Sequence, residues 1–336
     1  MSYSKFIFNS KKLLENLEAL PTKNVCAVVK ANAYGAGVEK VCKTLNSKVR
    51  FFAVATLAEA LKIRSFDKAT PILVLGMCEN FALAAKHDIS VTVENMGQLE
   101  YLMKSNFDQI KIHLKINTGM NRYGIKNKKI LKKTIKLLKN NKKIIFEGIF
   151  THFYFLKNEF KTKQQLEVFK EYLLIVQKSF SPIVHIGGGG VCEKLEFDDY
   201  KNFMVRVGLN LYKNVVFVES KVVKVFVLKR GQNLGYDGGF VANKNVVVAV
   251  VPLGYADGIN RKLGNNAYVS VNGCLCKIIG NVCMDVFFID VSGVKCVVGD
   301  VVKVFEDAGY WANICDTVPY EILTSLNYSR MKKEDV

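Results

Sequence analysis

The sequence predicts an α/β fold in which a (β/α)8 barrel is followed by a β-rich C-terminal domain. Short apolar runs alternate with helix-like segments over roughly the first 210 residues. After Tyr212, apolar runs follow one another with Gly and Asn turns and little helical spacing. The chain has 336 residues, 50% of them apolar, which suffices for one large and one smaller domain. We therefore expect a barrel over residues 1–215 and a β-rich domain over residues 216–336.

Eight candidate strands lie in the first part of the chain and share a short, apolar, β-branched composition. They are residues 25–30, 51–56, 71–76, 89–94, 111–117, 146–153, 183–186 and 204–208. Helix-like stretches between them include residues 57–66, 96–105, 130–138 and 164–177. Eight strands alternating with helices favour a closed barrel, although a doubly wound open sheet gives the same local pattern.

The second domain is predicted from a series of strand-like segments. They are "KVVKVFVLK", "NVVVAVVPLG", "AYVSVNG", "DVFFIDVS" and "DVVKVFE". A helix-like stretch at residues 320–327 follows them.

The net charge of +18 raises nucleic acid or a membrane surface as a partner. Nine lysines, however, fall between Lys126 and Lys143, among apolar residues at helical spacing: Ile130, Leu131, Ile135 and Leu138. This pattern indicates the solvated face of an amphipathic helix, so we expect neither partner. A nucleic-acid-binding role stays as an alternative, and it predicts salt-sensitive retention of DNA.

Cysteine usage indicates reduced thiols in the cytosol. The nine cysteines include no C-x-x-C pair, and the start of the chain carries no apolar signal segment. The same spacing argues against a structural zinc site, and we expect no metal. The longest apolar run, residues 246–251, is stopped by Pro252 and is too short to span a bilayer.

Four residues that carry or can take up positive charge, Lys30, Lys115, His152 and Arg206, are predicted to face the barrel interior near the carboxyl ends of their strands. Burying such charge without a partner is costly, so an anionic ligand is expected there. The "GGGG" at residues 187–190 follows the seventh strand, where barrels often bind phosphate.

Each of these residues also has a structural interpretation. A lysine at a strand end is commonly a surface residue whose stem packs on apolar neighbours. His152 is also consistent with a hydrogen-bonded core histidine, and Arg206 with a partner of Asp198 or Asp199. The four glycines are also consistent with a flexible turn. The coincidence of all these features at one end of one barrel favours a ligand site.

The sequence resembles the alanine racemases, pyridoxal-phosphate (PLP) enzymes built from a barrel and a β-rich domain. The resemblance covers nearly the whole chain, through "AVVKANAYGAG", "HLKINTGMNRYG", "THF", "RVGLNLY", "GYADG", "NVCMD" and "PYEIL". It implies a cytosolic homodimer that interconverts L-alanine and D-alanine and supplies D-alanine for peptidoglycan.

The resemblance also implies roles for individual residues. Lys30 forms the Schiff base with PLP and shares the acid–base work with Tyr236, which the family supplies from the second subunit. Arg206 faces the pyridine nitrogen and keeps it unprotonated, while His152 hydrogen-bonds Arg206. The other implied cofactor contacts are Tyr34, Gly188, Gly189, Gly208, Leu209 and Tyr328. The implied substrate-site residues are Arg122, Tyr255, Met284 and Asp285. Lys115 matches a lysine that many members carry as a carbamate, an anion able to pair with Arg122.

Several positions depart from the family pattern. Gly188 and Gly189 stand where Asn-Ser is common, so a serine hydroxyl is missing from the phosphate site. Ala36 replaces a histidine and Lys213 a glycine, and the "RVPR" continuation near Tyr328 is absent. A broader racemase acting on serine, a PLP-dependent decarboxylase and a non-catalytic PLP-binding protein are the alternatives. Arg206 argues against the decarboxylase, and the length of the second domain argues against the single-barrel binding protein.

Overall fold

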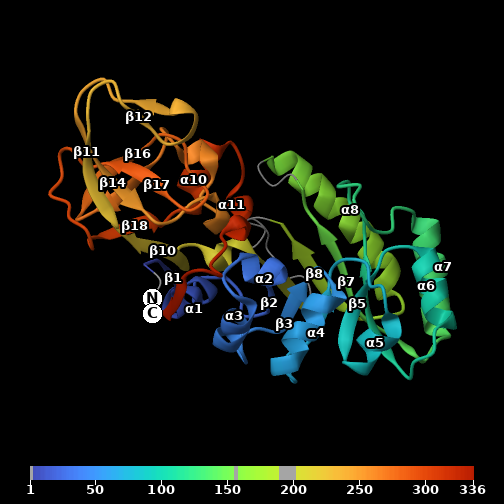
Figure 1. The fold of residues 1–336 in the computed structure, drawn as a ribbon. Helices are drawn as coiled ribbons and strands as arrows, with labels where there is room; N and C mark the ends of the chain where they lie inside the picture. Colours follow the sequence, from blue (N-terminus) through green and yellow to red (C-terminus); the bar gives the residue numbers. More distant parts are fainter. Residues whose placement is uncertain (1–2, 155–157, 189–201) are drawn as a thin grey trace. The chain divides into compact units, whose positions relative to one another are not determined.

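The computed structural model describes residues 3–154, 158–188 and 202–336, which form two compact units (Figure 1). The first, called here the barrel unit, comprises Leu14–Ala33 and Gly37–Leu211. The second, called here the β unit, comprises the residues up to Leu13, Tyr34–Ala36 and Tyr212–Val336.

The barrel unit is built on a closed, parallel, eight-stranded barrel, which confirms the predicted fold and excludes the open sheet. The strands, in order around the barrel, are β2 (Val25–Val28), β3 (Phe51–Val54), β4 (Ile72–Val74), β5 (Ile89–Val93), β6 (Ile110–Lys115), β7 (Ile144–His152), β8 (Ile183–Gly187) and β9 (Phe203–Val207). Pairing of β9 with β2, with Cys26 opposite Arg206, closes the barrel. The barrel thus brings the carboxyl ends of all eight strands to one rim.

Helices connect these strands, and most begin at a side chain that caps the first turn. They are α3 (Val38–Leu45), α4 (Leu57–Phe66), α5 (Phe81–Lys86), α6 (Met96–Lys104), α7 (Lys128–Lys139) and α8 (Glu159–Gln177), with α1 (Ser10–Glu18) before β2. Thr56 and Glu59 form a capping box at α4, and an Asn side chain caps each of α5 to α8.

The lysine-rich helix α7 buries one face, as its spacing predicts, but the buried stripe differs by one residue. Leu131, Thr134, Ile135 and Leu138 are buried, whereas Ile130 is 41% exposed. Including Ile130 in the stripe was therefore wrong, since it lies on the face that the lysines occupy.

The β unit contains a nine-stranded sheet, confirming a β-rich C-terminal domain. Its order is β11 (Lys224–Leu228), β14 (Val246–Val251), β17 (Phe287–Asp290), β16 (Cys274–Ile279), β15 (Tyr268–Val271), β18 (Val301–Phe305), β10 (Val216–Lys221), β1 (Lys5–Phe8) and β19 (Lys332–Asp335). A small hairpin, β12 (Asn233–Leu234) and β13 (Phe240–Val241), and helices α10 (Ala308–Cys315) and α11 (Pro319–Ser325) complete it. Residues from both ends of the chain thus lie in one sheet, with β1 parallel to β19.

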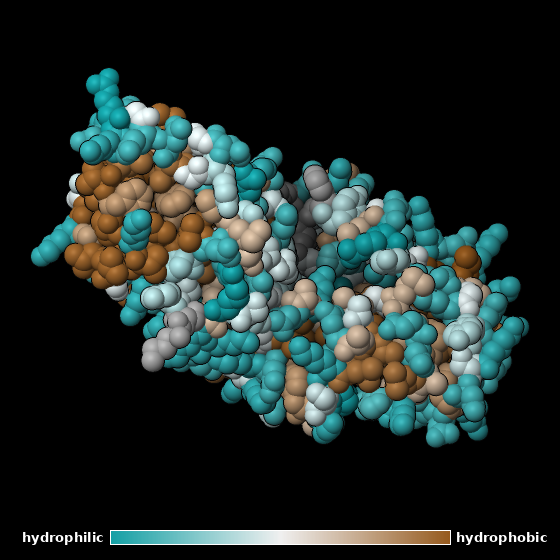
Figure 2. All heavy atoms as spheres, viewed as in Figure 1, coloured by the Kyte–Doolittle hydropathy of each residue, from teal (hydrophilic) through white to brown (hydrophobic). Residues whose placement is uncertain are grey.

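The surface of the β unit carries apolar residues over β11 and β14 (Figure 2). Beneath them lies a small core to which Leu228, Val246, Val248 and Ile279 contribute. Val227 of β11 stays 56% exposed. In the described part of the chain every cysteine is a free thiol, and no helix there is long and apolar enough to cross a membrane.

Candidate active site

The residues singled out from the sequence form two groups, one in each unit. Lys30, Lys115, Arg122, His152, Arg206, Gly188, Gly208 and Leu209 belong to the barrel unit. Tyr34, Tyr236, Tyr255, Met284, Asp285 and Tyr328 belong to the β unit. Gly189, Asp198 and Asp199 lie outside the described residues.

Lys30 stands at the start of a left-handed turn that follows β2. Four consecutive residues that are not glycine, from Ala31 to Tyr34, have φ between 51° and 55°. For L-residues this conformation costs roughly 1–2 kcal/mol each, because Cβ approaches the following carbonyl oxygen. Strain of this kind persists only where surrounding contacts fix the backbone, and such positions cluster at functional sites.

The contacts that hold this turn come from side chains. Glu59 accepts a hydrogen bond from the Ala31 amide at 2.6 Å through one carboxylate oxygen and from the Ala55 amide at 2.8 Å through the other. Asn32 accepts one from the Val38 amide at 3.0 Å. Glu59 therefore fixes Lys30 relative to the ends of β2 and β3. Glu59 was not predicted as a site residue, although its position in the capping box of α4 marks it as a side chain that binds backbone amides.

The electrostatic environment of Lys30 favours its neutral amine. Burial lowers the pKa of Lys30, and the positive charges of Arg122 and Arg206 lower it further, while Glu59 acts in the opposite direction. An amine with a lowered pKa is a better nucleophile and a more effective base near neutral pH.

Lys115, at the end of β6, shares this environment. Burial and the charges of Arg122 and Arg206 lower its pKa to about 8. Its ammonium lies 4.9 Å from the ring centroid of Tyr123. Together with Arg122 and His152, these residues line one small pocket.

His152, at the end of β7, is held in its neutral form. Burial and then the charges of Arg206 and Arg122 lower its pKa to about 3. It is therefore available as a neutral hydrogen-bonding group at neutral pH.

Arg206 is buried inside the barrel and keeps its charge, although burial lowers its pKa to about 10. One terminal nitrogen contacts Nδ1 of His185 at 2.7 Å, and the other donates to the Thr151 carbonyl oxygen at 2.9 Å. Within the described residues no hydrogen bond joins Arg206 to His152, so that expected contact is absent here. The guanidinium is directed instead at His185 and at the Thr151 carbonyl oxygen.

Gly188 follows β8 and Gly208 follows β9, and each contributes only backbone atoms to the rim of the barrel. Gly188 is half-buried with φ of 152°, a conformation that L-residues rarely adopt. The Gly208 carbonyl accepts a hydrogen bond from the Leu211 amide at 2.9 Å, opening the short 3-10 helix that starts at Leu209.

In the β unit, the predicted residues gather around the loop of residues 281–285. Asn281 donates to the Tyr236 carbonyl oxygen at 3.0 Å, and the Tyr255 amide donates to the Cys283 carbonyl oxygen at 3.0 Å. Three large side chains remain open to solvent: Tyr236 is 59%, Met284 50% and Tyr255 41% exposed. Exposed aromatic and apolar groups at one place are typical of surfaces that meet a partner or ligand.

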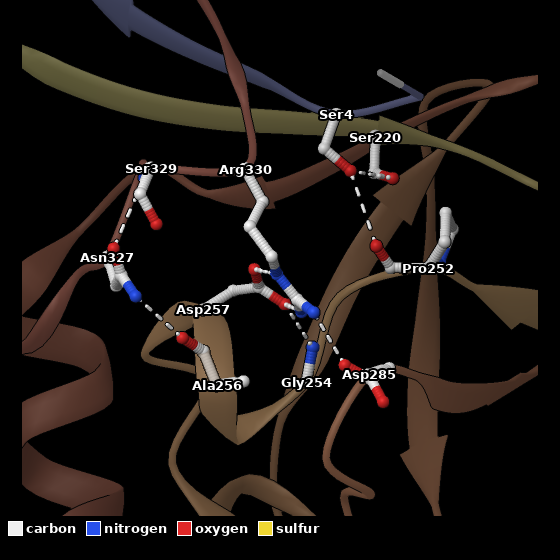
Figure 3. Close-up of polar contacts among 10 residues, drawn as sticks. All are labelled: Ser4, Ser220, Pro252, Gly254, Ala256, Asp257, Asp285, Asn327, Ser329 and Arg330. Atoms are coloured by element: carbon white, nitrogen blue, oxygen red, sulfur yellow. Dashed lines mark hydrogen bonds and ion pairs between the residues drawn. The ribbon is translucent and has the colours of Figure 1, made fainter. Parts of the chain in front are cut away.

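Arg330 connects the turn that contains Tyr255 and Asp257 to the loop of residues 281–285 (Figure 3). Its guanidinium donates to both carboxylate oxygens of Asp257, at 2.9 and 2.6 Å, and to Asp285 at 2.6 Å. Asp257 is only 1% exposed and also accepts a hydrogen bond from the Gly254 amide. Arg330 was not predicted as a site residue, because its segment lacks the family's usual continuation.

The two remaining tyrosines are packed within the β unit. The Tyr34 ring is buried between Tyr212 and Tyr320, with centroid distances of 4.9 and 5.8 Å. The Tyr328 ring packs on Phe6 at 4.2 Å, with the Lys333 ammonium 4.9 Å from its centroid.

The rim of the barrel unit therefore combines a lysine of lowered pKa with an excess of fixed positive charge. Such a site suits a ligand that is anionic and reacts with an amine. The fold and the site define the class: a barrel enzyme with a lysine of lowered pKa at the carboxyl ends of its strands.

Comparison with known proteins narrows this class. The family model described as "Alanine racemase, N-terminal domain" matches residues 3–214, and "Alanine racemase, C-terminal domain" matches residues 215–334. The alanine racemase of Helicobacter pylori strain J99 is 34% identical, with 95% of each sequence covered. The crystal structure of alanine racemase from E. faecalis matches with a TM-score of 0.89 and 27% identity, covering 100% of this chain and 98% of that one. The Bartonella henselae alanine racemase, whose structure holds covalently bound pyridoxal phosphate, matches with a TM-score of 0.89 and 26% identity, covering 100% of both chains.

The chain belongs to the alanine racemase family. It is an isomerase of the racemase type.

Proposed function

We propose that this protein is a PLP-dependent alanine racemase that works by two bases, Lys30 and Tyr236. The observation that carries the proposal is Lys30 itself. It stands on a strained left-handed turn held by Glu59, with a pKa lowered by burial and by Arg122 and Arg206. A half-buried lysine of this kind is suited to bind a carbonyl compound covalently.

The residues of the barrel rim fit PLP. Positive charge for an anionic cofactor comes from Lys115, Arg122 and Arg206. At Gly188 the absence of a side chain would let the backbone approach the cofactor closely. Lys30 would hold PLP covalently, with Tyr34, His152, Gly188, Gly189, Gly208, Leu209 and Tyr328 as further contacts. When bound, PLP supplies an electron sink that makes the α-proton of an amino acid removable.

Proton transfer on the two faces of the substrate is assigned to two different residues. The Lys30 amine removes or returns the proton on one face, and the Tyr236 hydroxyl, from the second subunit of a homodimer, acts on the other. Arg206 stays protonated at neutral pH and would donate to the pyridine nitrogen of PLP, which would then carry no proton.

Lys115 is proposed as a carbamate. Only the neutral amine reacts with CO2, and a pKa of about 8 leaves a substantial neutral fraction near neutral pH. The resulting anion would pair with Arg122 and orient it toward the substrate carboxylate. Tyr255, Met284 and Asp285 of the second subunit complete the substrate site in this proposal.

The surface of the β unit supports a homodimer with shared active sites. Tyr236, Tyr255 and Met284 are exposed around one loop, and apolar residues cover β11 and β14 (Figure 2). We place the enzyme in the cytosol, with D-alanine for peptidoglycan as its product.

The test combines absorbance and racemisation. Purified wild type is expected to show the absorbance of lysine-bound PLP and to form D-alanine from L-alanine. Lys30→Ala should lose both, and Tyr236→Phe should keep the absorbance while losing most racemisation. Tyr268→Phe, at a 45% exposed tyrosine of the same unit, is the matched control and should behave as wild type. Bound PLP without activity toward alanine would contradict the assignment of alanine as the substrate. A protein that binds no PLP would contradict the assignment of the cofactor.

A further inference from the structure

A continuous chain of hydrogen bonds crosses the interior of the barrel from Glu147 to Arg206. Arg206 contacts Nδ1 of His185 at 2.7 Å, and Nε2 of His185 contacts Nδ1 of His113 at 2.7 Å. Nε2 of His113 in turn contacts the Glu147 carboxylate at 2.9 Å, which also accepts a hydrogen bond from Ser90 at 2.5 Å. We call Glu147, His113 and His185 the histidine column.

The donors and acceptors of the column allow one arrangement of protons. A guanidinium only donates, so Nδ1 of His185 must be the acceptor and Nε2 must carry the hydrogen. That hydrogen points to Nδ1 of His113, which must accept, leaving the hydrogen of His113 on Nε2 and directed at Glu147. Both imidazoles are therefore neutral, and every link runs in the direction from Arg206 to Glu147.

The backbone is shaped to admit the column. The register between β6 and β7 shifts at His113, so Glu147 is an extra residue in β7 between the partners of Ile112 and His113. A Cβ on Gly148 would lie 2.1 Å from Nδ1 of His113, and a Cβ on Gly187 would lie 2.4 Å from a terminal nitrogen of Arg206. Glycine at these two positions leaves the space that the ring and the guanidinium fill.

Aromatic rings pack against the column on its sides. The Phe150 ring stacks on His185 at a centroid distance of 4.8 Å and lies 4.6 Å from the Arg206 guanidinium. Phe51 contacts His113 edge to face at 5.7 Å. These apolar neighbours strengthen the hydrogen bonds, since the local dielectric is low.

We propose that Glu147 and His113, acting through His185, are positioning residues that fix the orientation of the Arg206 guanidinium and supply its counter-charge from the far end of the column. The contact of Arg206 with PLP rests on the proposed function, whereas the hydrogen bonds of the histidine column are independent of it.

The charges around the column agree with this assignment. Burial lowers the pKa of both His113 and His185, and Arg206 and Arg50 lower them further. Glu147 acts in the opposite direction on His113, but the net shift is downward for both rings, so both stay neutral near pH 7. Burial raises the pKa of Glu147, but hydrogen bonds from His113 and Ser90 and the charge of Lys111 outweigh it, and the net shift is downward.

The first test observes the protons of the column in the full-length protein without cofactor. The chain has four histidines, so ¹⁵N labelling of histidine gives few signals. We expect His113 and His185 both as neutral rings with hydrogen on Nε2. A wild-type protein in which either ring carries hydrogen on Nδ1 overturns the column, whatever the variants do.

The second test asks whether Glu147 acts through the chain of bonds. In Glu147→Ala we expect the His185 signals to shift although Glu147 does not touch His185. Glu147→Gln, whose amide oxygen still accepts from His113, should return the His185 signals toward their wild-type positions. Asp67→Ala removes a part-buried carboxylate bound to the Thr70 and Ala69 amides, outside the column, and should leave both signals in place. If the His185 signals do not shift in Glu147→Ala, Glu147 has no effect on His185 through His113, and the inference is overturned.

The third test concerns the cofactor. Glu147→Ala should weaken PLP binding by about tenfold or more, as expected for loss of a hydrogen bond to a charged group, with Glu147→Gln closer to wild type. If wild type shows the expected protons but binds no PLP, the proposed function fails and the column stands. If PLP binds equally to Glu147→Ala, the positioning role is overturned while the proposed function stands.

Discussion

At the scale of single residues, glycines decide whether the charged side chains of the barrel fit. Gly148 and Gly187 leave room for His113 and Arg206, and a methyl group at either position would approach a polar atom far inside contact distance. Packed interiors tolerate such additions poorly, because neighbouring side chains must leave their preferred rotamers. The two glycines therefore belong to the site as much as the side chains they accommodate.

Gly148→Ala is expected to destabilise the protein by about 1–3 kcal/mol, because the added methyl group displaces the His113 ring. Urea unfolding measures the change. Gly293→Ala is the control, since nothing lies within 4 Å of a Cβ at that position, and it should change stability by much less. Equal effects of the two substitutions would contradict the role assigned to Gly148.

At the scale of secondary-structure elements, short turns carry the site, and the strands position them. The turn after β2 holds four left-handed residues in sequence, fixed by Glu59 and Asn32. In the β unit, the turns of Tyr236 and Tyr255 meet the loop of residues 281–285, and Arg330 binds Asp257 and Asp285. In both units, side chains from distant elements hold the backbone of a turn.

Relief of the strain in the first turn should be measurable. Ala31 is exposed with φ of 51°, so Ala31→Gly should raise the free energy of unfolding by about 0.5–1 kcal/mol, and Ala31→Val should lower it. Thermal or urea unfolding of the two variants compares them directly. A glycine variant less stable than the valine variant would show that the turn is not left-handed at this position.

Loss of Arg330 should loosen the second set of turns. Arg330→Ala leaves the buried Asp257 carboxylate without its ionic partner, and we expect a loss of about 1–3 kcal/mol, since Arg330 itself is partly exposed. Arg330→Lys should recover only part of it, because a lysine cannot bind two carboxylate oxygens in the same way. Lys332→Ala, which removes an exposed pair with Glu334, is the control and should change little. Equal stability of Arg330→Ala and wild type would contradict a stabilising role for the contacts of Arg330 with Asp257 and Asp285.

Much of this architecture follows from sequence patterns, and the exceptions have physical reasons. The barrel strands were predictable because they are short apolar runs, and the inward Lys115 and Arg206 followed from alternation along β6 and β9. The helices α1, α3, α5 and α10 were missed, since none is longer than nine residues and α10 is largely apolar. The strand β19, "KKED", has no strand-like composition and forms because β1 offers it a free edge. Glu147 was missed because a bulge breaks the alternation on which the prediction relied.

At the scale of the whole molecule, buried neutral histidines link stability to pH. The pKa values of His113, His152 and His185 are all lowered, chiefly by burial, to about 3 for His152. An unfolded histidine binds a proton below its ordinary pKa of about 6.5, whereas the folded groups stay neutral. Below that pH the unfolded state therefore binds more protons, and stability falls as the pH decreases. The lowered pKa of Glu147 acts in the same direction below about 4.5.

We expect the urea concentration at the midpoint of unfolding to be lower at pH 5 than at pH 7.5, with most of the decrease below pH 6.5. His152→Gln should reduce the slope, because one of the groups that must take up a proton is gone. A midpoint that is flat or rises on acidification would contradict the neutral state of these histidines.

The central claim is that each active site joins Lys30 of one subunit to Tyr236 of another, and mixing two inactive variants tests it most directly. Lys30→Ala and Tyr236→Phe subunits, unfolded together in equal amounts and refolded, should form mixed dimers in which one site carries both substitutions and the other carries neither. Racemisation of L-alanine should then return to about a quarter of the wild-type rate, since half of the dimers are mixed and each has one intact site. No recovery of activity, with wild type refolded alongside regaining its own, would contradict the shared site.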